Sequence, residues 1–218
     1  MRAAEATSAG RVYGGRSAGE READRRARLL AAAHDIVGTQ GYAALTVERL
    51  CARANVSSRS FYQLYDGKEA AFADLYDELL VRSGAKVVAS LAATEGEPLA
   101  ERVPAALLAY LVPLFDDLRA ARIVFVEVVG LSTRIESTRL RNREKLIELI
   151  VAEGEAAVVR GEAADRDWRF AALSLIGSAT AVALDWMLRT ERPAVTLLER
   201  QLGELAVTLL TATPRTRP

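Results

Sequence analysis

The chain has 218 residues, half of them hydrophobic, which is enough to bury a sizeable core in one large domain or two small ones. Its 29 Lys and Arg balance 29 Asp and Glu, so the net charge by itself indicates no nucleic-acid partner. The single cysteine, Cys51, excludes an intrachain disulfide. The sequence contains no run of about 18 apolar residues, so no membrane span is expected. These features favour a protein of the reducing cytoplasm that has no membrane partner.

The charges are unevenly distributed. Residues 1–68 carry 11 Lys and Arg against 7 Asp and Glu, whereas the rest of the chain carries an excess of acids. A basic N-terminal part followed by an acidic remainder is typical of a protein whose N-terminal part binds phosphate groups. The arginines of residues 1–20 superficially resemble those of a transit peptide, but no apolar segment of a secretory signal is present. The Gly, Ala and Ser content favours a disordered tail over these 20 residues.

Helix-forming residues dominate the rest of the chain, and alternating strand patterns are rare. We expect an all-α fold of about nine helices, three short ones at the front and six mostly long ones behind. The predicted helices span residues 20–39, 46–53, 57–64, 67–93, 99–118, 123–131, 133–159, 165–190 and 194–212. Residues 123–131 are almost all apolar, which predicts a helix buried on most sides and leaves a strand as the weaker alternative. Gly41 is the expected left-handed end of the first long helix.

Residues 46–65 have the pattern of two short helices joined by a tight turn. Thr46 and Ser57 are expected to cap the two helices, because their hydroxyls can accept hydrogen bonds from free backbone amides. Asn55 lies in the turn, where it tolerates a left-handed conformation better than most residues, and Phe61 points inward. A helix as short and polar as 57–64 buries little, so we interpret it as a helix presented to a partner.

Side chains of this kind can enter the major groove of double-stranded DNA. Arg59 can pair with a guanine edge and Gln63 with an adenine edge, whereas Tyr62, Tyr65 and Lys68 suit phosphates. Asp66 and Glu69 are predicted to form a capping box at the start of the next helix, whose free amides favour a phosphate. The candidate DNA-binding residues are Thr46, Ser57, Ser58, Arg59, Ser60, Tyr62, Gln63, Tyr65 and Lys68.

The segment from about Arg25 to Leu79 resembles the DNA-binding domain of the TetR family of transcriptional regulators. The matching residues are Leu30, Ala33, Gly41-Tyr42, Leu45-Thr46-Val47, Leu50-Cys51, Ala54-Asn55-Val56-Ser57, Ser60-Phe61-Tyr62, Tyr65, Lys68-Glu69 and Phe72. The family usually has Gly at Asn55 and Phe at Ile36 and Tyr65, and all three departures are physically conservative. The resemblance implies a helix-turn-helix domain over residues 21–67 and a helical body over 68–213 that binds a small effector and forms a homodimer.

Candidate effector contacts are polar or aromatic side chains among apolar residues of the body. They are Tyr110, Phe115, Glu127, Trp168, Asp185 and Trp186, each of which also has a structural interpretation. Trp168 and Trp186 are five helical turns apart and are expected on one face of the same helix, where core or dimer packing is the alternative. The small residues Ser174, Gly177, Ser178 and Ala181 between them predict a dimer seam with Leu197, Leu198, Leu202, Leu205 and Leu209 of the last helix.

Other functions have weaker support. One cysteine and one histidine, His34, make a zinc site improbable, and no phosphate-binding or dinucleotide motif implies a cofactor. Cys51 is interpreted as a small core hydrophobe, with redox sensing as the alternative. The sequence therefore predicts a non-enzymatic repressor that a hydrophobic or aromatic effector releases from a palindromic operator. An enzyme with a vestigial head and a helical protein adaptor are the rival hypotheses.

Overall fold

The computed structural model describes residues 17–211, and within this range the chain is built of helices and contains no strand. This arrangement confirms the predicted all-α class. The elements are α1 (Ala18–Gln40), η1 (Tyr42–Ala44), α2 (Val47–Ala54), α3 (Ser58–Tyr62), α4 (Lys68–Ala93), α5 (Leu99–Phe115), α6 (Leu118–Arg122), η2 (Ile123–Glu127), α7 (Thr133–Val159), α8 (Trp168–Leu188) and α9 (Val195–Thr211).

The first helix starts inside the predicted tail. Ser17 caps α1: its hydroxyl accepts a hydrogen bond from the amide of Glu20 at 3.1 Å, and the Glu20 carboxylate accepts one from the Ser17 amide. This capping box satisfies two amides that would otherwise lack partners. The tail prediction is therefore wrong for residues 18–20, and its remaining part, residues 1–16, lies outside the described residues. At the other end of α1, Gly41 has a positive φ of 84° but an extended ψ of 166°, so it is not a left-handed cap.

The apolar run at 123–131 does not form one helix. Residues 123–127 form the π-helical turn η2, which continues α6, and a turn at Gly130 with a positive φ of 72° ends it. Asp117 begins α6 by accepting a hydrogen bond from the amide of Arg119 at 3.0 Å. The predicted helix over residues 99–118 is too long, because α5 ends at Phe115 and a new helix, α6, begins at Leu118. The helix α5 itself continues through Pro104 and Pro113.

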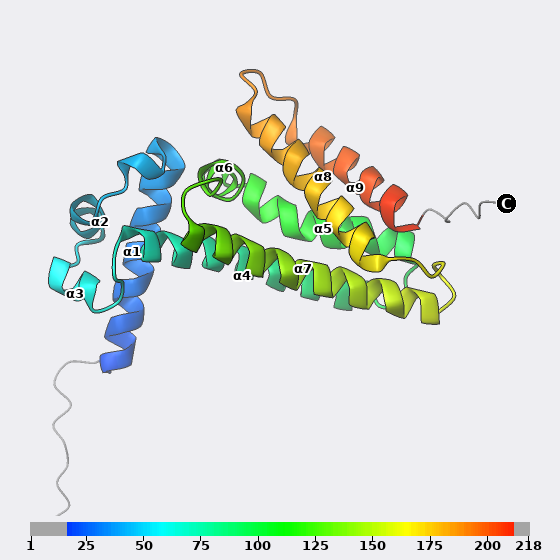
Figure 1. Cartoon of the computed structure of the whole chain (residues 1–218), viewed down its shortest axis with the longest axis horizontal. Coiled ribbons are helices and arrows are strands. Elements are labelled where there is room, and N and C mark those ends of the chain that lie inside the picture. The colour runs from blue at the N-terminus through cyan, green and yellow to red at the C-terminus, as the bar shows by residue number, and fades with distance from the viewer. Residues whose placement is uncertain (1–16, 212–218) are drawn as a thin grey trace, which may run out of the picture.

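The molecule is elongated, with α1, α2 and α3 forming a head at one end and the remaining helices forming a body (Figure 1). The long helix α4 leaves the head and packs against α5 and α7, α5 packs against α9, and α7 packs against α8. One hydrophobic cluster runs from Leu29 and Phe61 in the head to Phe115 and Trp186 in the body. A second cluster, around Leu99 and Trp168, fills the far end of the body. Head and body therefore share a core.

Helix α8 is long and apolar enough to cross a membrane by length and composition alone. The same helix packs on α7 and α9 and buries both tryptophans, Trp168 and Trp186. A helix that is hydrophobic nearly all round is also what the core of a helical body requires. Four large apolar side chains of α8 are nevertheless exposed in the single chain: Phe170, Leu173, Val182 and Leu188.

Candidate DNA-reading head and effector cavity

The backbone of the head is fixed by local hydrogen bonds. Thr46 accepts one from the amide of Arg49 at 3.2 Å, and Ser57 accepts one from the amide of Ser60 at 3.1 Å. Asn55 ends α2 in a left-handed conformation, with φ 50° and ψ 51°. The structure thus has both predicted caps and the predicted turn, and these features set the angle at which α3 leaves α2.

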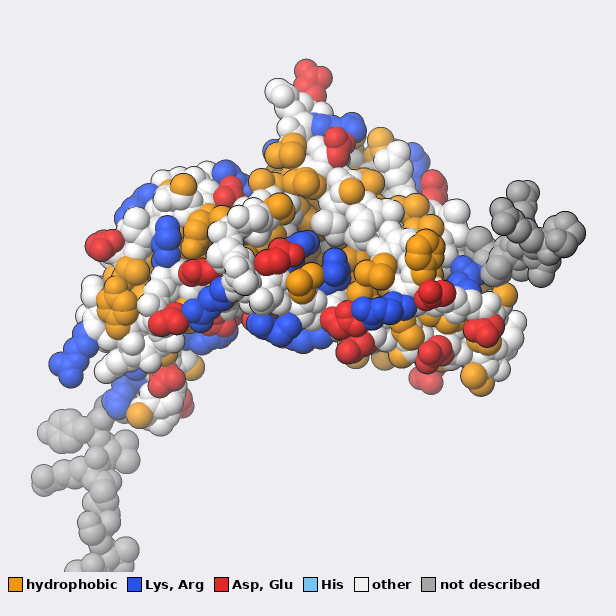
Figure 2. Space-filling view, in the orientation of Figure 1, with side chains coloured by type: hydrophobic (Ala, Val, Ile, Leu, Met, Phe, Trp, Pro, Cys, Tyr) orange, Lys and Arg blue, Asp and Glu red, His pale blue; other side chains and the backbone are white. Residues whose placement is uncertain are grey.

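The outer side of α3 presents polar side chains to solvent. Ser58, Arg59 and Gln63 are exposed, and Tyr62 is 60% exposed. Phe61 is fully buried and anchors the helix in the core, so the exposed set has a fixed orientation. Lys and Arg side chains project from the outer edge of the head (Figure 2). This is the composition and shape of a helix that can enter a major groove.

Four of the predicted DNA contacts have a structural role in the head. The hydroxyl of Ser57 donates to the hydroxyl of Ser60 at 2.9 Å, and Ser60 is half-buried. Lys68 is half-buried as well, with its Nζ donating to the carbonyl of Leu45 at 2.9 Å and lying 4.6 Å from the centroid of the Tyr42 ring. Thr46 is half-buried at its cap position. All four residues therefore already have hydrogen-bond partners within the head.

Tyr65 belongs to the core of the head. It is 8% exposed, and its hydroxyl donates to the carboxylate of Asp74 at 2.5 Å. The guanidinium of Arg26 binds the same carboxylate through two hydrogen bonds of 2.7 and 2.8 Å. Burial and the adjacent Asp74 raise the pKa of Tyr65 well above its usual value, so the phenol stays protonated as a donor. The expected phosphate contact of Tyr65 is therefore wrong, because the hydroxyl faces a carboxylate inside the fold.

The predicted capping box at α4 is also wrong. Gly67 is the N-cap residue and offers no side-chain hydrogen bond. Asp66 instead pairs with Arg134 at 2.9 Å, and Glu69 accepts a hydrogen bond from Ser132. Both partners lie at the start of α7, so these carboxylates connect the head to the body instead of capping α4.

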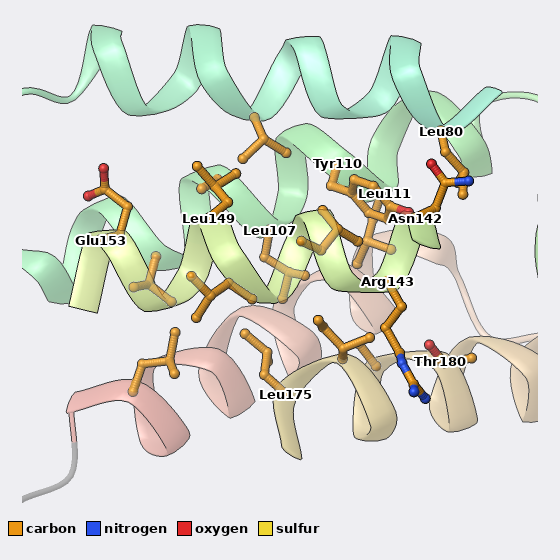
Figure 3. A pocket seen from close by; sticks show the side chains of 18 of the residues that line it. Leu80, Leu107, Tyr110, Leu111, Asn142, Arg143, Leu149, Glu153, Leu175 and Thr180 are labelled. Carbon is orange, nitrogen blue, oxygen red and sulfur yellow. The ribbon is translucent and has the colours of Figure 1, made fainter. Parts of the chain in front are cut away.

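The body contains a partly open, apolar cavity of about 180 Å³ between α4, α5, α7, α8, η2 and α9. Figure 3 shows leucines, among them Leu107, Leu149 and Leu175, between a polar end at Glu153 and another at Asn142, Arg143 and Thr180. Tyr76 also lines the cavity, and burial raises the pKa of its phenol to about 12, so it presents a neutral hydroxyl. A cavity with apolar walls and a few polar groups is typical of a small-molecule site.

Two of the predicted effector contacts, Tyr110 and Trp168, line this cavity. The other four residues lie elsewhere. The ring of Phe115 packs on Phe125 and Trp186 at centroid distances of 5.7 and 5.4 Å. The indole nitrogen of Trp186 donates to the carbonyl of Pro193 at 3.0 Å.

The two acidic candidates are accounted for by ion pairs. Asp185 is exposed and pairs with Arg189 at 2.6 Å, and Glu127 pairs with Arg122 at 2.8 Å. The structure therefore does not place Phe115, Glu127, Asp185 or Trp186 in the cavity wall. Arg102, Asn142 and Arg143 do line it, and sequence reasoning missed them. Arg102 could have been noticed as a charge within the apolar pattern of residues 99–115.

The sequence of residues 29–75 matches the family described as bacterial regulatory proteins, tetR family. The chain belongs to the TetR family. Its matched segment is the helix-turn-helix head together with the start of α4. No curated protein matches the chain by sequence.

Solved structures match this TetR-family chain over head and body together. The fatty acid degradation regulator FadR from Bacillus halodurans is 18% identical with a TM-score of 0.75, covering 88% of this chain and 97% of that one. FadR from Bacillus subtilis, solved in complex with stearoyl-CoA, is 16% identical with a TM-score of 0.75, covering 84% and 97%. A TetR/AcrR-family regulator from Thermobifida fusca is 20% identical with a TM-score of 0.66, covering 88% and 100%. At such identities the likeness concerns the fold.

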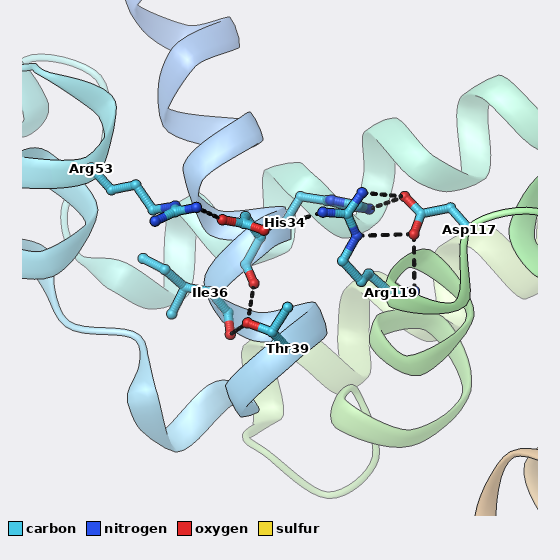
Figure 4. A network of polar contacts seen from close by, with 7 residues as sticks. His34, Ile36, Thr39, Arg53, Asp117 and Arg119 are labelled. Carbon is cyan, nitrogen blue, oxygen red and sulfur yellow. Dashed lines mark hydrogen bonds and ion pairs between the residues drawn. The ribbon is translucent and has the colours of Figure 1, made fainter.

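In this TetR-family chain, polar contacts join the head to α6 (Figure 4). Asp35 of α1 pairs with Arg119 of α6 at 3.1 Å and also with Arg53 of α2. His34 lies 3.1 Å from Asp117, but burial lowers the pKa of His34 despite this carboxylate. Burial would raise the pKa of Asp117, yet hydrogen bonds from Arg119 outweigh it and hold the pKa below its usual value. The contact is therefore mainly one between a carboxylate and a neutral imidazole near neutral pH.

The π turn η2 touches both the cavity and the head. Val124 and Phe125 line the cavity. Two residues further along, Glu127 accepts a hydrogen bond from the amide of Tyr42 in the head at 2.8 Å. Arg122, at the end of α6, donates to the carbonyl of Thr39 at 3.1 Å. The segment formed by the end of α6 and η2 therefore contacts both the cavity and the end of α1.

Proposed function

We propose that this TetR-family regulator is an effector-controlled repressor. Two copies of α3 would enter successive major grooves of a palindromic operator, with Arg59 and Gln63 reading bases and Tyr62 contacting phosphate. The functional division is the one expected from sequence, with residues 21–67 as the DNA-binding domain and 68–213 as the effector-binding and dimerisation domain. Its site of action is the cytoplasm, where the DNA is.

The regulatory part of this proposal rests on one observation: the segment at η2 contacts both the cavity and the head. Val124 and Phe125 belong to the cavity wall, whereas Glu127 and the adjoining Arg122 bind the head. An effector controls DNA binding only if it binds two conformations unequally. Displacement of η2 would give such a difference, because it changes the cavity and the position of α1 together. In the effector-bound dimer, the distance between the two heads would then no longer match the operator, and the protein would dissociate from the DNA.

We infer that the effector is elongated and largely apolar. The polar ends of the cavity, at Asn142 and Glu153, both lie on α7, and an α-helix rises 1.5 Å per residue, so they are about 16 Å apart. A chain molecule fits this shape better than a compact aromatic one. The similarity to FadR of Bacillus subtilis, solved with stearoyl-CoA, supports an acyl chain as the apolar part.

A homodimer is proposed on the basis of α8. Its outward side has an apolar stripe at the three- and four-residue spacing of a helix-packing seam, made of Phe170, Leu173, Gly177, Ala181, Leu184 and Leu188. Phe170 is 69% exposed and Leu188 is 66% exposed in the single chain. The seam expected on α9 needs correction, since Leu198 and Leu202 are buried in the chain's own core. The proposed interface is therefore centred on α8.

Selection of genomic DNA fragments by the purified full-length protein tests this function. We expect enrichment of a palindromic sequence, and release of the selected fragment when an acyl-CoA is added, measured by fluorescence anisotropy. Release should be absent with free CoA, because it has no chain to fill the apolar cavity. An operator that stays bound at saturating acyl-CoA would contradict the effector class while leaving DNA binding intact.

A further inference from the structure

One end of the cavity holds hydrogen-bond donors that have no acceptor. Arg102 and Trp168 both line the cavity, and they are 6% and 5% exposed. Among the described residues, neither the Nε of Arg102 nor the Nε1 of Trp168 has a hydrogen-bond partner, and both atoms are inaccessible. A buried donor left without an acceptor costs roughly 1–3 kcal/mol, so such groups are uncommon in a finished fold.

The two side chains contact adjacent residues of α7. The Nη2 of Arg102 binds the carboxylate of Glu153 at 2.7 Å. The next residue, Gly154, lies against the indole of Trp168 so closely that a Cβ at this position would be 2.2 Å from the ring. Trp168 is thus fixed by packing, and Arg102 is fixed by its ion pair. Neither donor can turn to another acceptor without breaking these contacts.

We propose that this end of the cavity is an acceptor site, which opens by a shift of the neighbouring side chains so that Arg102 and Trp168 donate hydrogen bonds to an oxygen of the effector. The inference rests on the proposed effector-binding function and names the chemistry of the ligand. Arg102 is already neutralised by Glu153, so the pair adds no net positive charge. A neutral oxygen, such as the carbonyl of a ketone, ester or thioester, fits better than a carboxylate, which would lie near the charge of Glu153.

The other end of the cavity has a different character. Arg143 is half-buried, its Nε also has no partner, and no ion pair within 4 Å is found for it among residues 17–211. Its partial exposure lets solvent reach the guanidinium, so it does not require a ligand atom as strictly as Arg102 does. An anionic head bound at Arg143 is the competing arrangement.

Three ligands of equal chain length separate these arrangements: decyl methyl ketone, dodecane and dodecanoate. Their affinities are measured by isothermal titration calorimetry on the full chain and on Trp168→Phe, which keeps an aromatic ring but removes the N–H donor. We expect the ketone to bind about 3- to 10-fold more weakly to this variant, while dodecane is unaffected. The matched control is Trp186→Phe, whose indole donor binds Pro193 outside the cavity, and it should leave all three affinities unchanged.

A fluorescence measurement keeps the test valid should Trp168→Phe not fold. In Trp186→Phe the only indole is Trp168, whose emission should shift to the red with the ketone and to the blue with dodecane. Equal affinities of ketone and dodecane for the wild type would overturn the inference and leave the cavity as a ligand site. Tighter binding of dodecanoate that is lost in Arg143→Met would also overturn it, in favour of an anionic head. Failure of all three to bind would overturn the effector role as well, independently of DNA binding.

Discussion

Two tyrosines in the head, Tyr62 and Tyr65, have opposite roles although they are three residues apart. Tyr62 is 60% exposed beside the residues that we expect to read DNA. Tyr65 lies just beyond α3, where the chain turns back into the core, and its hydroxyl is held by Asp74. The change in backbone direction after Tyr62 separates the two side chains. Their hydroxyls can therefore be removed separately to distinguish DNA contact from stability.

Tyr65→Phe is expected to lower the free energy of unfolding by about 1.5–3 kcal/mol, because it removes a hydrogen bond to a charged, partly buried carboxylate. Operator affinity per folded molecule should stay unchanged. Tyr62→Phe is the matched variant and should do the reverse, weakening operator binding without lowering stability. Urea unfolding and fluorescence anisotropy measure the two quantities. An affinity loss confined to Tyr65→Phe would restore Tyr65 as a DNA contact.

The residues that sequence predicted correctly in the head depend on near neighbours in the chain. Thr46, Asn55 and Ser57 interact with backbone within a few residues, so their caps and turn follow from local preferences. Tyr65 depends on Asp74, which in turn binds Arg26, 48 residues earlier in the chain. Such a partnership has no local signature. Arg102 and Trp168 are even further apart in sequence, and although each has a local signal, their juxtaposition in the cavity wall has none.

At the scale of elements, α6 and α1 approach each other unusually closely at Gly38. A Cβ at this position would lie 2.3 Å from the Cβ of Arg119 and 3.0 Å from its Cα, so backbone as well as side chain would have to move. The close approach also lets Arg119 reach Asp35. We expect this glycine to be required for the contact that couples the head to the cavity.

Gly38→Ala is therefore expected to lower stability by about 1–3 kcal/mol through overpacking and to weaken release of DNA by effector. Gly84→Ala is the matched control, because Gly84 lies on the helix α4 with nothing within 4 Å of a Cβ, and the change should be neutral or slightly stabilising. Thermal unfolding and effector titration of the operator complex are the measurements. Wild-type stability and release in Gly38→Ala would show that α1 and α6 do not need this contact.

Long helices could be predicted from sequence because their periodicity extends over several turns. The helix α7 begins and ends where the pattern indicates, at Thr133 and Val159. The segment at 123–131 offers no such guide, since its residues are nearly all apolar and no face is distinguished. Its π turn instead contacts the cavity through Val124 and Phe125 and the head through Glu127. The least predictable element is therefore the one that we propose as the link between the two sites.

For the whole molecule, the account requires two copies, because a single head reads only half of a palindrome. The exposed stripe on α8 supplies the proposed contact between copies. Gly177 lies in the middle of it and has nothing within 4 Å of a Cβ in the single chain. A larger side chain at this position should leave the monomer fold undisturbed and prevent close approach of a second α8.

Gly177→Glu is expected to give a folded monomer, because a carboxylate in an apolar seam must be desolvated without a partner. Light scattering after size-exclusion chromatography reports the mass, and circular dichroism reports the fold. Gly84→Glu, at an equally open helical glycine on α4, should remain a dimer. A Gly177→Glu protein that remains dimeric would place the interface elsewhere.

The most direct test of the central claim compares the DNA sequences selected by the wild type and by Arg59→Ala at one fixed salt concentration. We predict that the wild type enriches a palindrome, and that Arg59→Ala loses about 1–3 kcal/mol of affinity with relaxed preference at one base pair in each half-site. Arg189→Ala, which removes an exposed arginine at the end of α8, should select the wild-type palindrome. An Arg59→Ala protein that selects the same sequence with the same affinity would contradict the assignment of α3 as the reading helix.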